Sequence, residues 1–188
     1  MDWILLLKSL YFFFPAYFAN MTPTFATHFT KESGFLAFLG KPIDFGKEYR
    51  GSPILGSHKT WRGVILGTFV GILIAFFQRL LWGFDFFRGI SFFNYREINI
   101  FFLGFLLSFG ALLGDLVTSF FKRRQKIEPG SSWIPFDQIS FIIGSFILVN
   151  PFFKIPIFSW LLILIFSFFL HIIVNRIGFW LKISPSKI

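Results

Sequence analysis

The chain has 188 residues, of which 55% are hydrophobic and 23% are aromatic, and Phe alone accounts for 33. Only 14% of the residues are charged, too few to cover the surface of a soluble domain of this length, so an ordinary soluble fold is excluded. In a soluble protein, the net charge of +9 would suggest nucleic acid as a binding partner. Since the cytoplasmic loops of membrane proteins collect Lys and Arg, we expect no nucleic-acid partner. The absence of Cys excludes disulfides and thiolate catalysis.

Five apolar stretches reach or approach the length of about 20 residues that crosses a hydrocarbon core. We therefore predict an all-α fold, a polytopic membrane bundle of five transmembrane helices. The second stretch contains Gly67 and Gly71, which allow helices to approach closely. The fourth is short, and the polar pair Asp137 and Gln138 at its start indicates an end that faces water or a cavity. The predicted spans cover residues 3–25, 64–82, 100–121, 136–152 and 157–174.

The distribution of Lys and Arg predicts the orientation of the bundle. An odd number of spans places the loop after the first span, the loop after the third span and the C-terminal tail on one side. These segments hold thirteen of the 18 Lys and Arg, and the other side holds five. Because basic loops stay in the cytoplasm, we predict that the N-terminus lies outside and the C-terminus lies inside.

The third span carries a carboxylate within its apolar run. Asp115 lies seven residues before Lys122, which places it roughly 10 Å inside the helix end. Asp115, Ser119 and Lys122 are spaced i, i+4 and i+7, so they share one face of the helix. A carboxylate at the bilayer centre costs on the order of 2.5 to 3.5 kcal/mol, so a partner is expected. Either a salt bridge to Lys122 or Arg62, or a metal or substrate site, provides that partner.

Asp137 is a second carboxylate near the same membrane face. It lies at the start of the fourth span, which is antiparallel to the third and joined to it by a loop. Two carboxylates without a neighbouring His or Cys favour a hard divalent cation, and we expect Mg²⁺ with Asp115 and Asp137 as its ligands. The alternative is that Asp137 only caps its helix.

Cations and hydroxyls suited to phosphate groups surround these acids. The basic run that ends the third span is explained in part by the positive-inside rule. The first loop combines glycines, hydroxyls and cations, although it lacks the GxxxxGK[ST] spacing of a P-loop. Facing a two-carboxylate site, this loop is a candidate wall for a polyphosphate. The candidate substrate-binding residues are Lys41, Asp44, Lys59, Thr60, Arg62, Ser119, Lys122, Arg123 and Arg124.

The two loops together resemble the CDP-archaeol synthase family, the archaeal branch of the membrane cytidylyltransferases that make CDP-activated lipids. The resemblance extends over nearly the whole chain. Bacterial-type relatives carry a Lys-Asp pair after the basic run, where this chain has Lys126-Ile127-Glu128, and this leaves open whether Glu128 helps to bind metal. The matching motifs are Gly114-Asp115-Leu116, Ser119, Lys122-Arg123, Pro135, Asp137-Gln138 and the first-loop segments 42–46 and 58–63.

The resemblance implies a single transmembrane catalytic domain over residues 1–188 and Mg²⁺ as cofactor. It implies CTP and a lipid phosphate similar to 2,3-di-O-geranylgeranylglyceryl phosphate as substrates, which give a CDP-lipid and pyrophosphate. Asp115 and Asp137 are implied as metal carboxylates and, with Lys122, as catalytic residues. Lys59, Arg62, Lys122 and Arg123 are implied as phosphate or nucleotide contacts.

Membrane geometry suits one soluble and one apolar substrate. We expect a multi-pass protein of the cell membrane whose active site faces the cytoplasm, where CTP arrives. The lipid can enter sideways between helices, with membrane lipids around the bundle, and a homodimer is compatible with the sequence. Both reactants are anions and a phosphate monoester is already ionised at neutral pH, so neutralising charge is the main task and no strong general base is required.

Two other functions fit part of the sequence. CDP-diacylglycerol synthesis on phosphatidic acid requires the same chemistry and differs in the lipid chains. A small membrane transporter component is compatible with Asp115 inside the membrane and with the glycine-rich second span. Transporters usually contain repeated halves, and no repeat is apparent in this sequence.

Overall fold

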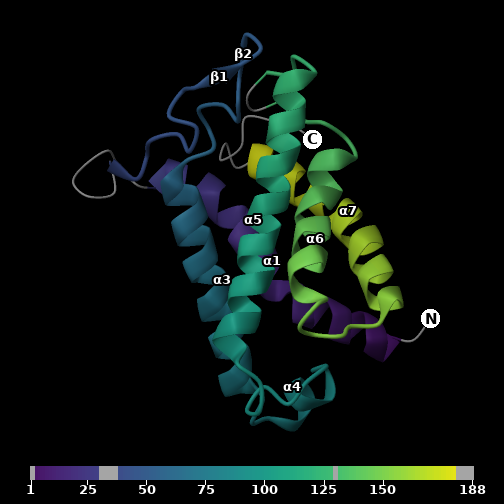
Figure 1. Cartoon of the computed structure of the whole chain (residues 1–188). Helices are drawn as coiled ribbons and strands as arrows, with labels where there is room; N and C mark the ends of the chain where they lie inside the picture. Colours follow the sequence, from purple (N-terminus) through teal and green to yellow (C-terminus); the bar gives the residue numbers. More distant parts are fainter. Residues whose placement is uncertain (1–2, 30–37, 129–130, 181–188) are drawn as a thin grey trace.

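The computed structural model describes residues 3–29, 38–128 and 131–180, which form a bundle of helices (Figure 1). Six helices and one two-stranded hairpin make up the regular structure of this part of the chain. Each of the five predicted spans corresponds to one helix, so the mainly helical fold is confirmed. The five bundle helices are α1 (Trp3–Phe29), α3 (Trp61–Leu81), α5 (Ile100–Arg124), α6 (Phe136–Val149) and α7 (Ile157–Trp180).

Three helices of the described chain, α1, α3 and α5, are long and apolar enough to cross a membrane. The α6 helix and the apolar stretch Ile157–Leu170 of α7 are shorter. With 14 residues, α6 is about 21 Å long, which is less than the hydrocarbon thickness of about 30 Å. The protein is therefore an integral membrane protein with three long apolar helices and two shorter ones. The α6 helix, which corresponds to the fourth predicted span, is short as predicted.

Polar side chains set where α3 and α5 begin. Thr60 is the N-cap of α3 and accepts a hydrogen bond from the backbone N–H of Gly63 at 3.2 Å. Asn99 caps α5 by accepting from the N–H of Phe102 at 3.1 Å. The α5 helix continues to Arg124, beyond the predicted end, so its last turn contains the basic run. Cations at this position interact favourably with the helix dipole.

Glycines bring α5 and α6 into backbone contact. A Cβ at Gly114 of α5 would lie 2.1 Å from the backbone oxygen of Ser140 in α6. A Cβ at Gly144 of α6 would lie 2.1 Å from the backbone oxygen of Gly110 in α5. Any larger residue would force the two helices apart. This close approach fixes the start of α6 beside the C-terminal half of α5.

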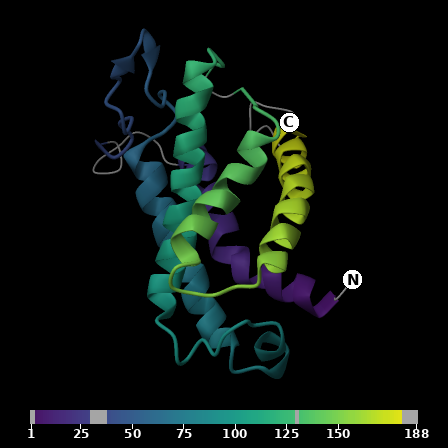
Figure 2. The same cartoon turned by 45° about the vertical axis from the view of Figure 1, so that its right-hand side comes forward.

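The α1 helix crosses the bundle and packs against α3 and α5 (Figures 1 and 2). A Cβ at Gly67 or Gly71 of α3 would lie 2.8 Å from a backbone oxygen of α1, that of Ala19 or Pro15 respectively. The close helix approach predicted from these glycines is confirmed.

A hairpin that the sequence did not indicate projects from the loop between α1 and α3. Strand β1 (Glu48–Tyr49) pairs antiparallel with β2 (Ser52–Pro53). The two turn residues, Arg50 and Gly51, have φ values of 54° and 72°, as in a type I′ turn. In Figures 1 and 2 the hairpin stands near the C-terminal end of α5.

The two ends of the bundle are built differently (Figures 1 and 2). We call one the basic end; it consists of the loop 38–60, the last turns of α5 and the first turn of α6. The other, the α4 end, carries the short helix α4 (Asp85–Gly89), which was not predicted. The described parts of both large basic loops meet at one end of the bundle, as the span count requires. Of the residues counted for orientation, Lys31, Lys182 and Lys187 lie outside the described residues.

Candidate functional site

Two ion pairs join three segments of the chain at the basic end. Nζ of Lys59, in the loop 38–60, lies 2.5 Å from Oδ2 of Asp115 in α5. Nζ of Lys122 in α5 lies 2.7 Å from Oδ2 of Asp137 in α6. The first pair is partly buried and the second more so, with 9% of Lys122 and 19% of Asp137 exposed. Both predicted carboxylates therefore lie at the same end of the bundle, each held by a lysine.

The partner of Asp115 differs from the sequence expectation. A salt bridge to Lys122 or Arg62 was one interpretation, and this pairing is wrong because Asp115 contacts Lys59. Lys122 lies about 10 Å further along the α5 axis. Its ammonium group turns to Asp137 of α6, and it also donates a hydrogen bond to the backbone oxygen of Ser131, in the loop before α6, at 2.5 Å.

The carboxylate of Asp137 fastens the start of α6 to α5. The N-cap position of α6 is occupied by Pro135, and Asp137 lies in the first helical turn. Besides Lys122, its Oδ2 accepts a hydrogen bond from the N–H of Trp133 at 2.8 Å. The interpretation of Asp137 as no more than a helix cap is therefore wrong, since it also bridges two helices.

Asp44 organises the loop that carries Lys59. Its Oδ1 accepts from the N–H of Gly46 at 3.0 Å, and its Oδ2 accepts from Leu55 at 2.8 Å and Gly56 at 3.1 Å. Burial alone would raise the pKa of this carboxyl, but the hydrogen bonds from Leu55, Gly56 and Gly46 outweigh burial and hold the pKa below its ordinary value. The observed partners of Asp44 are thus backbone groups of its own loop.

Backbone pairing places Lys59 directly before α3. Its backbone oxygen accepts from the N–H of Ile43 at 2.8 Å, and Pro42 and Thr60 form an antiparallel bridge. The Thr60 side chain is buried and caps α3. Lys41 lies 4.9 Å from the centre of the Phe38 ring. Of the candidates in this loop, Lys59 is the one whose cation reaches a site carboxylate.

Two buried arginines have donors available for an anion. Arg62 is 7% exposed and Arg123 is 5% exposed. Among the described residues, Nε of Arg62 and both Nε and Nη1 of Arg123 have no hydrogen-bond partner. Leaving a buried donor unpaired costs on the order of 1–3 kcal/mol. Phosphate oxygens would supply the acceptors, so both residues remain candidate phosphate contacts.

Arg124 is engaged with the hairpin. Its Nη2 donates to the backbone oxygens of Ser52 and Pro53. Its guanidinium also lies over the rings of Phe120 and Tyr49, at 4.6 and 5.4 Å. These contacts tie β2 to the end of α5.

Ser119 is buried on α5 between Asp115 and Lys122, as the helical spacing predicts. Gln138 was noted in the sequence as part of the polar pair with Asp137, but it was not among the candidate site residues. It is completely buried, and neither its amide nitrogen nor its amide oxygen has a hydrogen-bond partner in the part of the chain that the structure describes. Because Asp137 is partly exposed and Gln138 is not, only the first of this polar pair reaches water. A buried unpaired amide beside a site carboxylate is a further functional candidate.

Comparison with known proteins decides the family. A family model described as CarS-like: CDP-archaeol synthase matches residues 2–186. The chain belongs to the CDP-archaeol synthase family. CDP-archaeol synthases from Pyrococcus furiosus and Methanocaldococcus jannaschii are each 34% identical to it, over 179 and 181 residues. The alignments cover 94% of this chain and 95% of the Pyrococcus protein, and 96% of this chain and of the Methanocaldococcus protein.

A solved structure is similar to this member of the CDP-archaeol synthase family in fold. It is described as an intramembrane enzyme for archaeal membrane lipids biosynthesis and is 24% identical in sequence. The TM-score is 0.70, and the match covers 90% of this chain and 94% of the other. The helical architecture of this CDP-archaeol synthase family member is therefore that of a known intramembrane enzyme.

The carboxylates of this CDP-archaeol synthase family member are suitable donors for Mg²⁺. Carboxylate oxygens are the ligands this ion prefers, and Asp115 and Asp137 present them at one end of the bundle. No group of three or more acidic or histidine side chains within metal-binding distance occurs among the described residues. Glu128 is exposed. Mg²⁺ is commonly bound by one or two carboxylates together with substrate phosphates and waters, and Asp115 and Asp137 offer oxygen donors of this kind.

Proposed function

We propose that the basic end of this chain catalyses the CTP-dependent formation of CDP-archaeol. CMP passes from CTP to the phosphate of an archaeal ether lipid, and pyrophosphate is released. Membership of the CDP-archaeol synthase family supports this reaction. The observation that carries the assignment to the basic end is the pair of Lys–Asp contacts, because they gather two cations and two carboxylates from three segments.

Repulsion between two anions is the main obstacle to this reaction. An oxygen of the lipid phosphate attacks the α-phosphorus of CTP, and the bond from that phosphorus to the bridging oxygen of pyrophosphate breaks. No proton has to move, because the attacking phosphate is already ionised. Lys59, Lys122, Arg62 and Arg123 supply positive charge from the loop, α3 and α5, and fixed charges in a partly buried site lower the barrier most effectively.

The ion pairs prepare the carboxylates before substrate arrives. Asp115 and Asp137 would hold Mg²⁺, which supplies charge neutralisation on the phosphate oxygens when it is bound. Lys59 and Lys122 keep these carboxylates in place at the basic end. Each lysine has three N–H donors and a flexible stem, so it can also reach a phosphate oxygen near its carboxylate.

The orientation follows from the same charges. We propose that the N-terminus lies outside and that the basic end faces the cytoplasm, where CTP is found. The excess of Lys and Arg in the segments at this end supports the proposal. Residues 1–188 form a single catalytic domain in this proposal, and a homodimer stays a prediction.

The substrate is tested by incubating the purified full-length chain with radiolabelled CTP, Mg²⁺ and one lipid phosphate at a time. We expect the label to enter lipid with 2,3-di-O-geranylgeranylglyceryl phosphate. Faster labelling of phosphatidic acid would make the protein a CDP-diacylglycerol synthase. No labelling with any lipid phosphate would contradict the proposed function and favour transport.

A further inference from the structure

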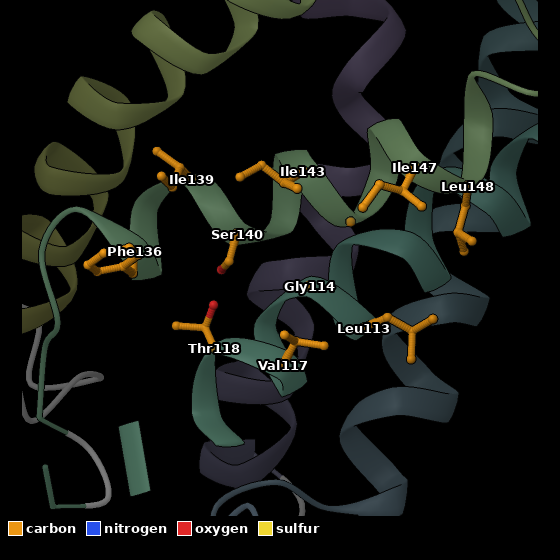
Figure 3. A pocket seen from close by; sticks show the side chains of 11 residues that line it. Leu113, Gly114, Val117, Thr118, Phe136, Ile139, Ser140, Ile143, Ile147 and Leu148 are labelled. Atoms are coloured by element: carbon orange, nitrogen blue, oxygen red, sulfur yellow. The ribbon is translucent and has the colours of Figure 1, made fainter. Parts of the chain in front are cut away.

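A groove between α5 and α6 runs toward the ion pair of Lys122 and Asp137. It has a volume of about 330 Å³ and is lined almost entirely by apolar side chains (Figure 3). Gly114 and Gly144 line the bottom of the groove, where the backbones of the two helices are in contact. Because these residues have no side chains, nothing projects from the bottom of the groove into the space between its walls. The walls include Val117 of α5 and Ile143 and Ile147 of α6, all exposed. In a membrane, such residues face hydrocarbon.

The groove is polar at one level near the start of α6, which we call its polar end. Thr118 and Ser140 line it there, and Figure 3 shows their hydroxyl groups pointing toward one another. Both residues are buried, and Oγ of Ser140 has no hydrogen-bond partner in the described residues. Thr118 lies four residues before Lys122 and Ser140 three residues after Asp137, which is about one helical turn in each case. The polar end therefore adjoins the proposed phosphate site.

We propose that this groove binds one isoprenoid chain of the acceptor lipid, with the hydroxyls of Thr118 and Ser140 facing the glycerol ether oxygens. This inference rests on the proposed function and adds the location of the lipid. Along α6, the lining from Ser140 to Leu148 extends over about 12 Å. One leaflet of the hydrocarbon core is about 15 Å thick, so this part of the groove covers most of the depth of a chain that descends from the headgroup region.

A second apolar groove is a weaker candidate for the chain. It lies between α1 and α3 and has a volume of about 520 Å³. Its hydroxyl, that of Thr22, already donates to the backbone oxygen of Phe18 at 2.7 Å. Neither α1 nor α3 contributes a site carboxylate. The α5–α6 groove is favoured because both of its helices carry one, Asp115 and Asp137.

Photolabelling tests the location without turnover. The full-length chain in lipid vesicles is irradiated with a lipid phosphate that carries a diazirine near the end of one isoprenoid chain. We expect labelled peptides from residues 113–117 and 143–147, and competition by unmodified lipid phosphate but not by the phosphate-free diether glycerol. Labelling of α1 and α3 instead, or equal competition by the phosphate-free lipid, would overturn the proposal.

Filling the groove tests its role in specificity. Val117→Trp or Ile143→Trp should lower the ratio of kcat/KM for the long-chain lipid to that for an analogue with short prenyl chains. The expected loss is about tenfold for every two methylene groups displaced. Ile165→Trp, at an exposed position of α7, is the matched control and should leave the ratio unchanged. An unchanged ratio in both groove variants would contradict the proposal, whereas absence of turnover in the unmodified chain would contradict the proposed function.

Discussion

The two ends of the bundle both contain acid–base pairs, but these pairs differ in construction. At the α4 end, Asp85 and Arg88 lie 3.3 Å apart within one short helix and are 96% and 50% exposed. At the basic end, Lys122 and Asp137 lie 2.7 Å apart on different helices and are 9% and 19% exposed. The types of the paired residues alone therefore do not distinguish a functional site from an ordinary exposed surface.

The basic end differs because its charged side chains come together from separate segments of the chain and are partly buried. An exposed pair within one helix contributes at most about 0.5 kcal/mol and creates little field beyond itself. Cations brought together from a loop and two helices, with part of their hydration removed, produce a positive field that favours a polyanion such as CTP.

The largest effect is expected at the two site carboxylates. Asp115→Asn and Asp137→Asn should each lower the rate of CMP transfer by about 100-fold or more, because a neutral amide loses the charge that binds a divalent cation and balances a lysine. The rate is measured with labelled CTP in membranes that contain equal amounts of inserted protein.

Asp85→Asn is the control at the α4 end and should keep the activity of the unmodified chain. An equal loss in all three variants would remove the contrast between the ends. Unmodified rates in both site variants would refute the assignment of Asp115 and Asp137.

The contact between α5 and α6 should be the most sensitive point of the packing. Gly144→Ala places a methyl group 2.1 Å from the backbone oxygen of Gly110. Because this distance is too short for two non-bonded atoms, the helices must separate. We expect a loss of about 1–3 kcal/mol in unfolding free energy, measured by denaturant titration in detergent. A Cβ at Gly89, in α4, meets no atom within 4 Å, so Gly89→Ala should be close to neutral. Similar destabilisation at both positions would contradict this account of the packing.

We expect Lys59 to contribute to the binding of CTP. Lys59→Met removes the cation beside Asp115 and should raise the CTP concentration for half-maximal rate by about tenfold, the value of one charge-assisted hydrogen bond. Lys59→Arg keeps the charge and should recover part of the loss. An unchanged CTP dependence in Lys59→Met would place the loop outside the nucleotide site.

A smaller and pH-dependent effect is expected at Asp44. Because its folded-state pKa lies below the ordinary value of 3.8, the carboxylate stabilises the fold fully above pH 3.8, and this contribution fades as the pH falls through the lowered pKa. Asp44→Asn should cost about 1 kcal/mol at neutral pH, since an amide replaces one of the two accepting oxygens with a donor.

The difference between Asp44→Asn and the unmodified chain should shrink when thermal unfolding is followed from pH 7 to below pH 3.8. A difference that does not change with pH would mean that the charge of Asp44 does not organise the loop.

The sequence was informative wherever one helix decides the geometry. Helical spacing placed Asp115, Ser119 and Lys122 along α5, and the short fourth apolar run predicted the short α6. The glycines of the second span indicated close packing, which the structure confirms at Gly67 and Gly71. These features depend on local periodicity, which a single sequence contains.

Pairings between distant segments could not be predicted in the same way. Lys59 and Asp115 are 56 positions apart, and their contact depends on how the loop folds around Asp44. The spacing of α5 suggested Lys122 for Asp115, because it cannot show that α6 offers Lys122 a nearer carboxylate. Likewise, the burial of Gln138 follows from the rotation of α6 against α5, which packing determines.

The central claim, that the basic end binds the nucleotide, is tested most directly by photolabelling. The full-length chain is irradiated with a photoreactive CTP analogue in the presence of Mg²⁺, and the labelled peptides are identified with and without excess CTP. We expect CTP-sensitive labelling at the basic end, within residues 56–62, 119–124 and 136–138. CTP-sensitive labelling of residues 84–99 at the α4 end, with none at the basic end, would contradict the account.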